Sequence, residues 1–166
     1  MTSYPFHVFL SHNSQDKALV AELKGILASN GLTCWLDKDE LRPGQNWIPL
    51  LEKGLNNSRA IAACYGPAGE GPWQSEEIQS ALRIAVRERR SVIPLLLPGA
   101  DREPELPLFL QNRGWVDCRQ GYTEETLREL LFGILGDRPP RVVLELSLIH
   151  ISEPTRLRRI SYAVFC

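Results

Sequence analysis

Short apolar segments alternate with longer amphipathic segments over roughly the first 136 residues of the chain. Five apolar segments predict buried β-strands, at residues 6–10, 33–36, 59–65, 91–97 and 115–118. The 59–65 segment is apolar at consecutive positions, which is typical of a central strand in a parallel sheet. Pro94 indicates an irregular or edge position within the fourth strand, because proline has no N–H to donate.

The amphipathic segments predict helices over about 16–30, 47–56 and 73–87, and a last helix that begins after Thr123. One face of the first helix is apolar at the 3.6-residue period, through Leu19, Val20, Leu23, Ile26 and Leu27. Ser14 is the expected N-cap of this helix, and Gly31 supplies a left-handed residue at its end. Thr123 is the expected N-cap of the last helix.

This alternation predicts an α/β fold with a five-stranded parallel sheet flanked by helices on both faces. In such sheets, ligands bind outside the carboxyl ends of the strands. The loops expected at those ends span residues 11–14, 37–46 and 66–72, and they contain most of the polar residues that could carry chemistry.

Composition places the chain among soluble globular proteins. It has 166 residues, 43% hydrophobic and 23% charged, with a formal net charge of -1. This balance argues against nucleic acid or an anionic membrane as the main partner. No apolar stretch has the length of a membrane span and no signal peptide is evident, so we expect a cytoplasmic location.

The cysteines are widely scattered, at Cys34, Cys64, Cys118 and Cys166. They form no CxxC pair and have no matched histidine spacing, which argues against both a disulfide framework and a zinc site. We expect free thiols in a reducing compartment and no metal.

The last 21 residues, 146–166, resemble translated sequencing-adapter read-through rather than natural protein sequence. We therefore expect one domain over residues 1–140, the start of a native linker at 141–145, and a foreign tail after it. A downstream sensor domain of the native protein is expected to be missing. The alternative is a genuine C-terminal strand followed by a basic helix.

Three segments together resemble the TIR (Toll/interleukin-1 receptor) domain family, in its bacterial branch. They are Val-Phe-Leu-Ser-His-Asn-Ser at 8–14 followed by Asp16, Cys-Trp-Leu-Asp-Lys-Asp-Glu-Leu-Arg-Pro-Gly at 34–44, and Gly-Pro-Trp-Gln-Ser-Glu-Glu at 71–77. Each pattern alone is weak, but their order and spacing over residues 5–136 make the resemblance strong. It implies the TIR version of the flavodoxin-like, three-layer α/β architecture.

The resemblance also implies an enzyme that cleaves NAD. The enzymatic members carry a tryptophan followed four residues later by a catalytic glutamate, which here are Trp73 and Glu77. This spacing puts both on one face of a helix. Cleavage develops positive charge on the ribose, which a carboxylate can stabilise. Glu76 lies about 100° around the helix from Glu77, and the resemblance alone favours Glu77.

Further candidates surround this pair. The expected substrate-binding residues are Trp73, Ser11, His12, Asn13, Asp39 and Trp47. The alternatives are a solvated loop acid for Asp39, a satisfied surface histidine for His12 and a core residue for Trp47. Gly71 departs from the serine that many catalytic members have two residues before the tryptophan. His12 and Asn13 stand where several members have basic residues.

The function that these features predict is an NAD glycohydrolase, releasing nicotinamide and ADP-ribose or a cyclic ADP-ribose, with NAD as substrate and no cofactor. The resemblance implies an effector of bacterial immune or stress signalling, including antiphage defence, that self-assembles with other TIR domains through the 37–46 loop. The alternative is a non-catalytic TIR interaction module. A phosphoacceptor receiver lacks support because no acidic pair follows the first strand, and the 37–44 loop argues against a nucleoside deoxyribosyltransferase. A Rossmann dinucleotide-binding unit is disfavoured because GxGxxG is absent.

Overall fold

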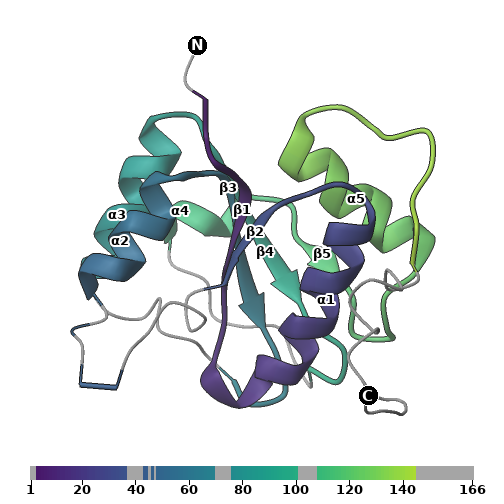
Figure 1. Cartoon of the computed structure of the whole chain (residues 1–166), viewed down its shortest axis with the longest axis horizontal. Coiled ribbons are helices and arrows are strands. Elements are labelled where there is room, and N and C mark those ends of the chain that lie inside the picture. Colours follow the sequence, from purple (N-terminus) through teal and green to yellow (C-terminus); the bar gives the residue numbers. More distant parts are fainter. Residues whose placement is uncertain are drawn as a thin grey trace.

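The computed structural model describes residues 3–36, 43–44, 46, 48–69, 76–100 and 108–144. Strands form the middle layer of the molecule, and helices lie on both sides of them (Figure 1). The strands are β1 (Phe6–Ser11), β2 (Cys34–Leu36), β3 (Ser58–Tyr65), β4 (Ser91–Leu96) and β5 (Val116–Asp117). All pairings are parallel and the strand order is β2-β1-β3-β4-β5, so the predicted five-stranded parallel sheet is confirmed.

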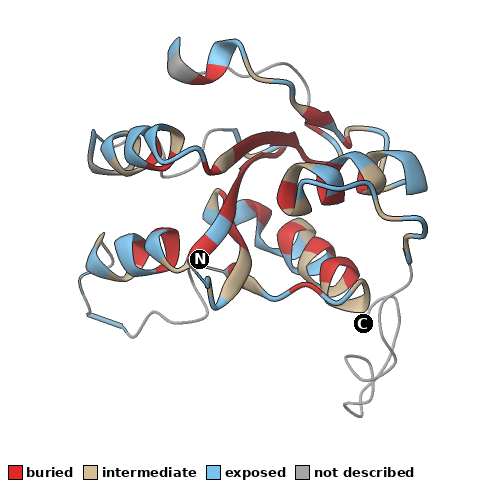
Figure 2. Ribbon diagram, turned by 90° about the horizontal axis from the view of Figure 1, so that it is seen from above, coloured by how far each residue is buried: buried red, intermediate tan, exposed pale blue. Residues whose placement is uncertain are grey.

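The helices divide between the two faces of the sheet. They are α1 (Lys17–Ser29), α2 (Ile48–Asn56), α3 (Glu76–Arg87), α4 (Leu108–Gln111) and α5 (Glu124–Leu135), with a short 3-10 helix η1 (Ser14–Asp16) before α1. One apolar core joins the sheet to α1 and α5, and a second joins it to α2, α3 and α4. In Figure 2 the strands are mostly buried, whereas the flanking helices carry both buried and exposed residues. The three-layer prediction is therefore confirmed.

Side chains along the central strands point alternately into the two cores. In β1, Val8 and Leu10 belong to the core beneath α1 and α5, and Phe9 belongs to the other core. In β3, Ala60 and Ala62 alternate in the same way with Ile61 and Ala63, as period-2 geometry requires. Because every one of these side chains is at most 1% exposed, neither face of the central strands is open to a ligand.

The start of the first helix differs from the prediction. Ser14 does not cap it; instead the Asn13 side chain accepts a hydrogen bond from the Gln15 N–H (3.0 Å) and caps η1. Asp16 occupies the N-cap position of α1 without making a side-chain capping bond. Sequence alone did not separate these residues because Ser, Asn and Asp all favour caps.

Pro94 lies in an interior strand, so it does not mark an edge strand of the sheet. β4 pairs with β3 along its length, with Pro94 opposite Ala63, and pairs with β5 only at Leu95 and Leu96. The N–H of Leu97 donates to Tyr65 O in β3, so the N–H groups at alternate residues face β3 and the nitrogen of Pro94 faces β5. The missing N–H therefore falls just before pairing with β5 begins.

The two helices that follow β1 and β3 end in the same hydrogen-bonding motif with different residues. At the end of α1, Leu32 N–H donates to Leu27 O and Gly31 N–H to Ala28 O, with Gly31 at φ +82°. At the end of α3, Arg90 and Arg89 N–H donate to Ala85 and Val86 O, with Arg89 at φ +62°. Both are Schellman ends, and Gly31 confirms the predicted left-handed residue.

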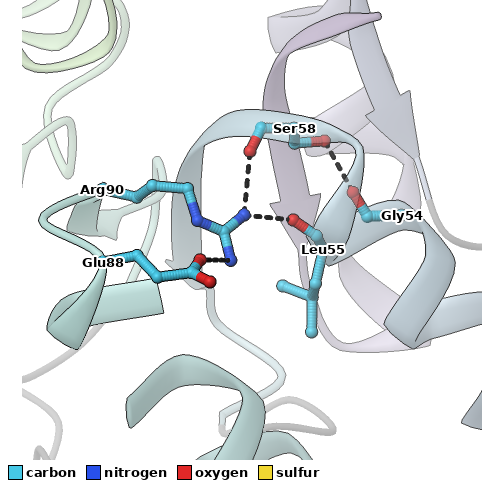
Figure 3. A network of polar contacts seen from close by, with 5 residues as sticks. All are labelled: Gly54, Leu55, Ser58, Glu88 and Arg90. Atoms are coloured by element: carbon cyan, nitrogen blue, oxygen red, sulfur yellow. Dashed lines mark hydrogen bonds and ion pairs between the residues drawn. The ribbon is translucent and has the colours of Figure 1, made fainter. Parts of the chain in front are cut away.

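A buried arginine closes the end of α2. Arg90, 7% exposed, donates from Nη1 to the backbone oxygens of Leu55 (2.5 Å) and Ser58 (3.0 Å), and Nη2 lies 3.0 Å from Glu88 Oε2 (Figure 3). Ser58 Oγ donates to Gly54 O (2.8 Å). These bonds satisfy carbonyls of the last α2 turn, which have no partner within the helix, and place positive charge at its negative end.

Residues 137–144, which we call the exit segment, return from α5 toward α1. The side chain of Asn30 donates to Val143 O (2.7 Å) and accepts from Val143 N–H (2.8 Å). Val142 and Leu144 are partly buried against the α1/α5 core. Residues 141–144 of the expected linker thus pack on the domain. The boundary at 140 and the nature of the tail remain predictions, and the tail lies outside the described residues.

Exchanging the two helix-end residues tests the backbone assignment. Gly31→Ala should lower the free energy of unfolding by about 1 kcal/mol, because alanine is strained at positive φ. A side chain there meets no atom within 4 Å, so crowding does not contribute. Arg89→Gly should raise it by about 0.5 kcal/mol through relief of the same strain. Urea unfolding measures both, and a destabilising Arg89→Gly would contradict the assignment.

Removing the buried guanidinium should be costly. Arg90→Met should lower the free energy of unfolding by about 2 to 4 kcal/mol, because two buried carbonyls lose a charged donor. Glu88→Gln is the control, since its carboxylate is 55% exposed and an exposed ion pair is worth about 0 to 1 kcal/mol. Equal losses for the two variants in urea unfolding would show that the guanidinium acts through Glu88 alone.

Candidate functional site

The strand order creates one point where ligands are expected. From β1 the chain passes to β2 on one side, and then crosses to β3 on the other side of β1. The connections that leave the carboxyl ends of β1 and β3 therefore diverge, which opens a crevice in sheets of this class. Ser11, His12 and Asn13 lie at the end of β1, and Gly66 begins the connection after β3.

Ser11 is the candidate whose environment fits a ligand contact best. It is 3% exposed and lies opposite Ala63 of β3. By alternation with Phe9 and Leu10 it faces the α2/α3/α4 side of the sheet. Its Oγ has no hydrogen-bond partner among the residues that the structure describes. Buried hydroxyls are normally bonded, so this one is suited to a polar ligand group.

His12 and Asn13 contribute to the structure of the loop. His12 is fully buried, with Nδ1 3.4 Å from Leu10 O, so the alternative of a surface histidine is wrong. Asn13 caps η1 through Oδ1 and donates from Nδ2 to Ala68 O (3.4 Å). A direct contact of either residue with a substrate remains a prediction.

Asp16, which was part of the first motif but not among the predicted site residues, also belongs to this region. It is 3% exposed, and its Oδ1 accepts the Ala68 N–H at 3.2 Å. The sequence indicated Asp16 only as an acidic residue at the start of a helix. The contact with the loop after β3 links residues 52 apart and depends on the strand order, so local pattern could not indicate it.

Glu76 and Glu77 are the first two residues of α3. Glu76 is exposed and shares its helix face with Ser80 and Arg87, which are also exposed. Since α3 follows β3, its start lies near the carboxyl edge of the sheet. The preference for Glu77 over Glu76 therefore stays a prediction from the family resemblance.

Several predicted site residues lie outside the described part of the chain. These are Trp73, Asp39, Trp47 and the side chain of Glu77. Of the 37–46 loop, Pro43, Gly44 and Asn46 are described and exposed, and Asn46 Oδ1 accepts the N–H of Ile48 at the start of α2 (3.2 Å).

The three thiols in the described part of the chain offer no alternative chemistry. Cys34, Cys64 and Cys118 are free, and burial raises the pKa of the Cys34 thiol to about 12, only partly offset by nearby Lys24. Burial also raises the pKa of Cys118. Such thiols stay protonated and are poor nucleophiles. Within the described ranges, no three His, Cys, Asp or Glu side chains gather as a metal site.

None of the described helices combines the length and the apolar composition needed to cross a bilayer.

Two curated proteins are similar to part of this chain. The NAD(+) hydrolase PdTIR of Paracoccus denitrificans (strain Pd 1222) is 31% identical over 98 residues, which are 57% of this chain and 33% of that protein. The probable 2' cyclic ADP-D-ribose synthase TcpO of Methanobrevibacter olleyae is 27% identical over 93 residues, which are 55% of this chain and 27% of that protein. The chain thus spans a third or less of the length of these relatives.

Solved structures share the fold. The TIR domain of the Toll-related receptor TRR-2 from Hydra magnipapillata superposes with a TM-score of 0.51 at 19% identity, over 68% of this chain and 83% of that one. A metazoan TIR-STING receptor from C. gigas in complex with 2',3'-cGAMP gives a TM-score of 0.55 at 18% identity, over 71% of this chain and 36% of that one.

A family model described as "TIR domain" matches residues 8–131. These residues include β1 from Val8 onward, β2 to β5 and most of α5. This match covers more than half of the chain, and its limits enclose both the Ser11 region and α3. The strand order and the three layers agree with it. The chain belongs to the TIR domain family.

Proposed function

We propose that the chain is an NAD glycohydrolase whose catalytic residue is Glu77. The observation that carries the proposal is that Glu77 stands at the start of α3, the helix that follows β3 and begins near the carboxyl edge of the sheet, where ligands bind in this class of fold. The names of the two curated relatives, a hydrolase of NAD(+) and a probable synthase of a cyclic ADP-ribose, support the same chemistry.

The proposed reaction breaks the bond between ribose C1′ and the nicotinamide nitrogen. The bonding electrons leave with nicotinamide, whose pyridinium form makes it a good leaving group, and positive charge develops on the ribose ring. The carboxylate of Glu77 stabilises that charge and binds ribose hydroxyls. Water, or a nucleophilic atom of the same ADP-ribose, then attacks C1′ and loses a proton. The product is ADP-ribose or a cyclic form of it.

The remaining site residues bind substrate in this proposal. Trp73 provides a flat wall for the ribose or a base, with Asp39 and Trp47 from the loop after β2 completing the pocket. Ser11 Oγ, buried and without a described partner, bonds a polar group of NAD. His12 and Asn13 shape the floor of the site. No cofactor or metal takes part.

The biological role proposed is that of an effector in bacterial immune or stress signalling, including antiphage defence. The domain acts in the cytoplasm and is switched on by homo-oligomerisation through the 37–46 loop, under the control of a sensor domain of the native protein. A non-catalytic interaction module is the alternative outcome that the following experiment separates.

Glu77→Gln should reduce nicotinamide release from NAD by at least ~100-fold, because the amide lacks the charge that stabilises the ribose cation. Glu76→Gln is the matched control and should retain activity. The assay uses the full chain at high protein concentration with a crowding agent, and chromatography identifies the product. Activity that survives Glu77→Gln and is lost in Glu76→Gln would overturn the assignment. Inactivity of the wild type under these conditions would favour the interaction module.

Ser11→Ala should raise the KM for NAD by about tenfold, the worth of one hydrogen bond, with little change in stability. Ser58→Ala is the control with the opposite expectation, because its hydroxyl bonds Gly54 O at the other end of β3. That variant should lose stability while its KM stays unchanged. A Ser11→Ala variant with a normal KM and lowered stability would assign the hydroxyl a structural role.

A further inference from the structure

The loops that follow β1 and β3 are fastened together at a single residue. Ala68 donates its N–H to Asp16 Oδ1 (3.2 Å), and its carbonyl oxygen accepts from Asn13 Nδ2 (3.4 Å). Both backbone groups of Ala68 are therefore held by side chains from the other loop. We call this arrangement the Ala68 clamp.

The Asp16 side chain bonds the loop after β3 and not the first turn of its own helix. It stands at the N-cap position of α1, where aspartate usually bonds a backbone N–H of the first turn, yet it makes no such bond. The side chain is 3% exposed. A buried carboxylate needs donors, and among the described residues the N–H that bonds Asp16 comes from Ala68, in the loop after β3.

Gly66 makes room for this carboxylate. A Cβ at position 66 would overlap Asp16, and the carboxylate carbon and oxygens would be its nearest atoms. Gly66 is not among the residues with positive φ, so it is required for space and not for backbone conformation. Gly66 and Gly69 close a tight turn through the Gly69 N–H and Gly66 O (3.0 Å), with Ala68 inside it.

We propose that Asp16 is a positioning residue for the catalytic helix. The clamped turn is where the chain leaves β3 on its way to Trp73 and α3, and the clamp ties that departure point to the loop that carries Ser11. The proposal rests on the proposed function: it assigns to Asp16 the placement of Glu77 relative to the Ser11 side of the pocket. Asp16 itself makes no contact with substrate.

Asp16→Ala should lower kcat for NAD by about 10- to 100-fold while KM changes less than about threefold, because a displaced catalytic group loses reaction geometry more than binding. Asp16→Asn keeps an acceptor oxygen for the Ala68 N–H and should recover most of the kcat. Asn30→Ala is the matched control. It removes three hydrogen bonds between a side chain and the backbone, two to Val143 and one to Ile26 O, and should leave kcat unchanged.

A double-mutant cycle tests the contact with Gly66. Gly66→Ala alone should lower kcat as Asp16→Ala does, because the new methyl group displaces the carboxylate. In the Asp16→Ala background the same change should have little further effect, since the obstructing carboxylate is gone. Multiplied losses in the double variant would contradict the contact. Gly66→Ala also keeps the proposal testable if Asp16→Ala fails to fold.

Hydrogen exchange separates this proposal from the proposed function. The Ala68 amide should exchange at least ~10-fold faster in Asp16→Ala and Gly66→Ala, whether or not NAD is cleaved. A wild type that cleaves NAD through Glu77, with Asp16→Ala as active as Asn30→Ala, overturns the positioning role alone. Loss of the Glu77 dependence overturns the proposed function, and the positioning role with it.

Discussion

Burial of the central strand pair on both faces is the constraint on which the rest of the structure depends. β1 and β3 send alternate side chains into two separate cores, and the residues that do so are almost entirely excluded from solvent. The small residues of β3 let helices approach from both sides. With both faces covered, the ends of the strands are the remaining places where polar side chains from distant parts of the chain can meet.

Buried polar groups lie at both the amino and the carboxyl edge of the sheet. At the amino edge, Arg90 and Ser58 satisfy the carbonyls at the end of α2, and Arg90 Nε has no hydrogen-bond partner among the described residues. At the carboxyl edge, Ser11 keeps a buried hydroxyl without a described partner. That edge is also where the family resemblance places the chemistry. The crossover in strand order, which makes the connections after β1 and β3 diverge at that edge, is the physical reason to assign function there.

Sequence pattern was sufficient for the architecture because the relevant signals are local. Runs such as 59–65 and the periodic face of α1 determine which segments are strands and helices, and alternation then fixes the sheet class. The short helix α4 escaped prediction because four residues carry no period. The predicted N-cap of the first helix, Ser14, was wrong because Asn13, Ser14 and Asp16 all have side chains that favour caps. The orientation of Asp16 depends on strand order, which no local pattern encodes.

The candidate site could be predicted from the sequence only where a family motif identifies its residues. Glu77 and Ser11 were found through family resemblance, and the preference for Glu77 over Glu76 still rests on that resemblance. The burial of His12 was not anticipated, because a polar residue after a strand is locally indistinguishable from an exposed loop residue.

The pairing of Asn30 with Val143 has a kinetic consequence. It joins positions 113 residues apart, so forming it early would close a loop that contains nearly the whole domain. The pair therefore forms after the sheet and its helices are in place. Interactions of this kind are absent from the folding transition state. They therefore slow unfolding and do not speed folding. The exit segment thus lengthens the lifetime of the folded domain.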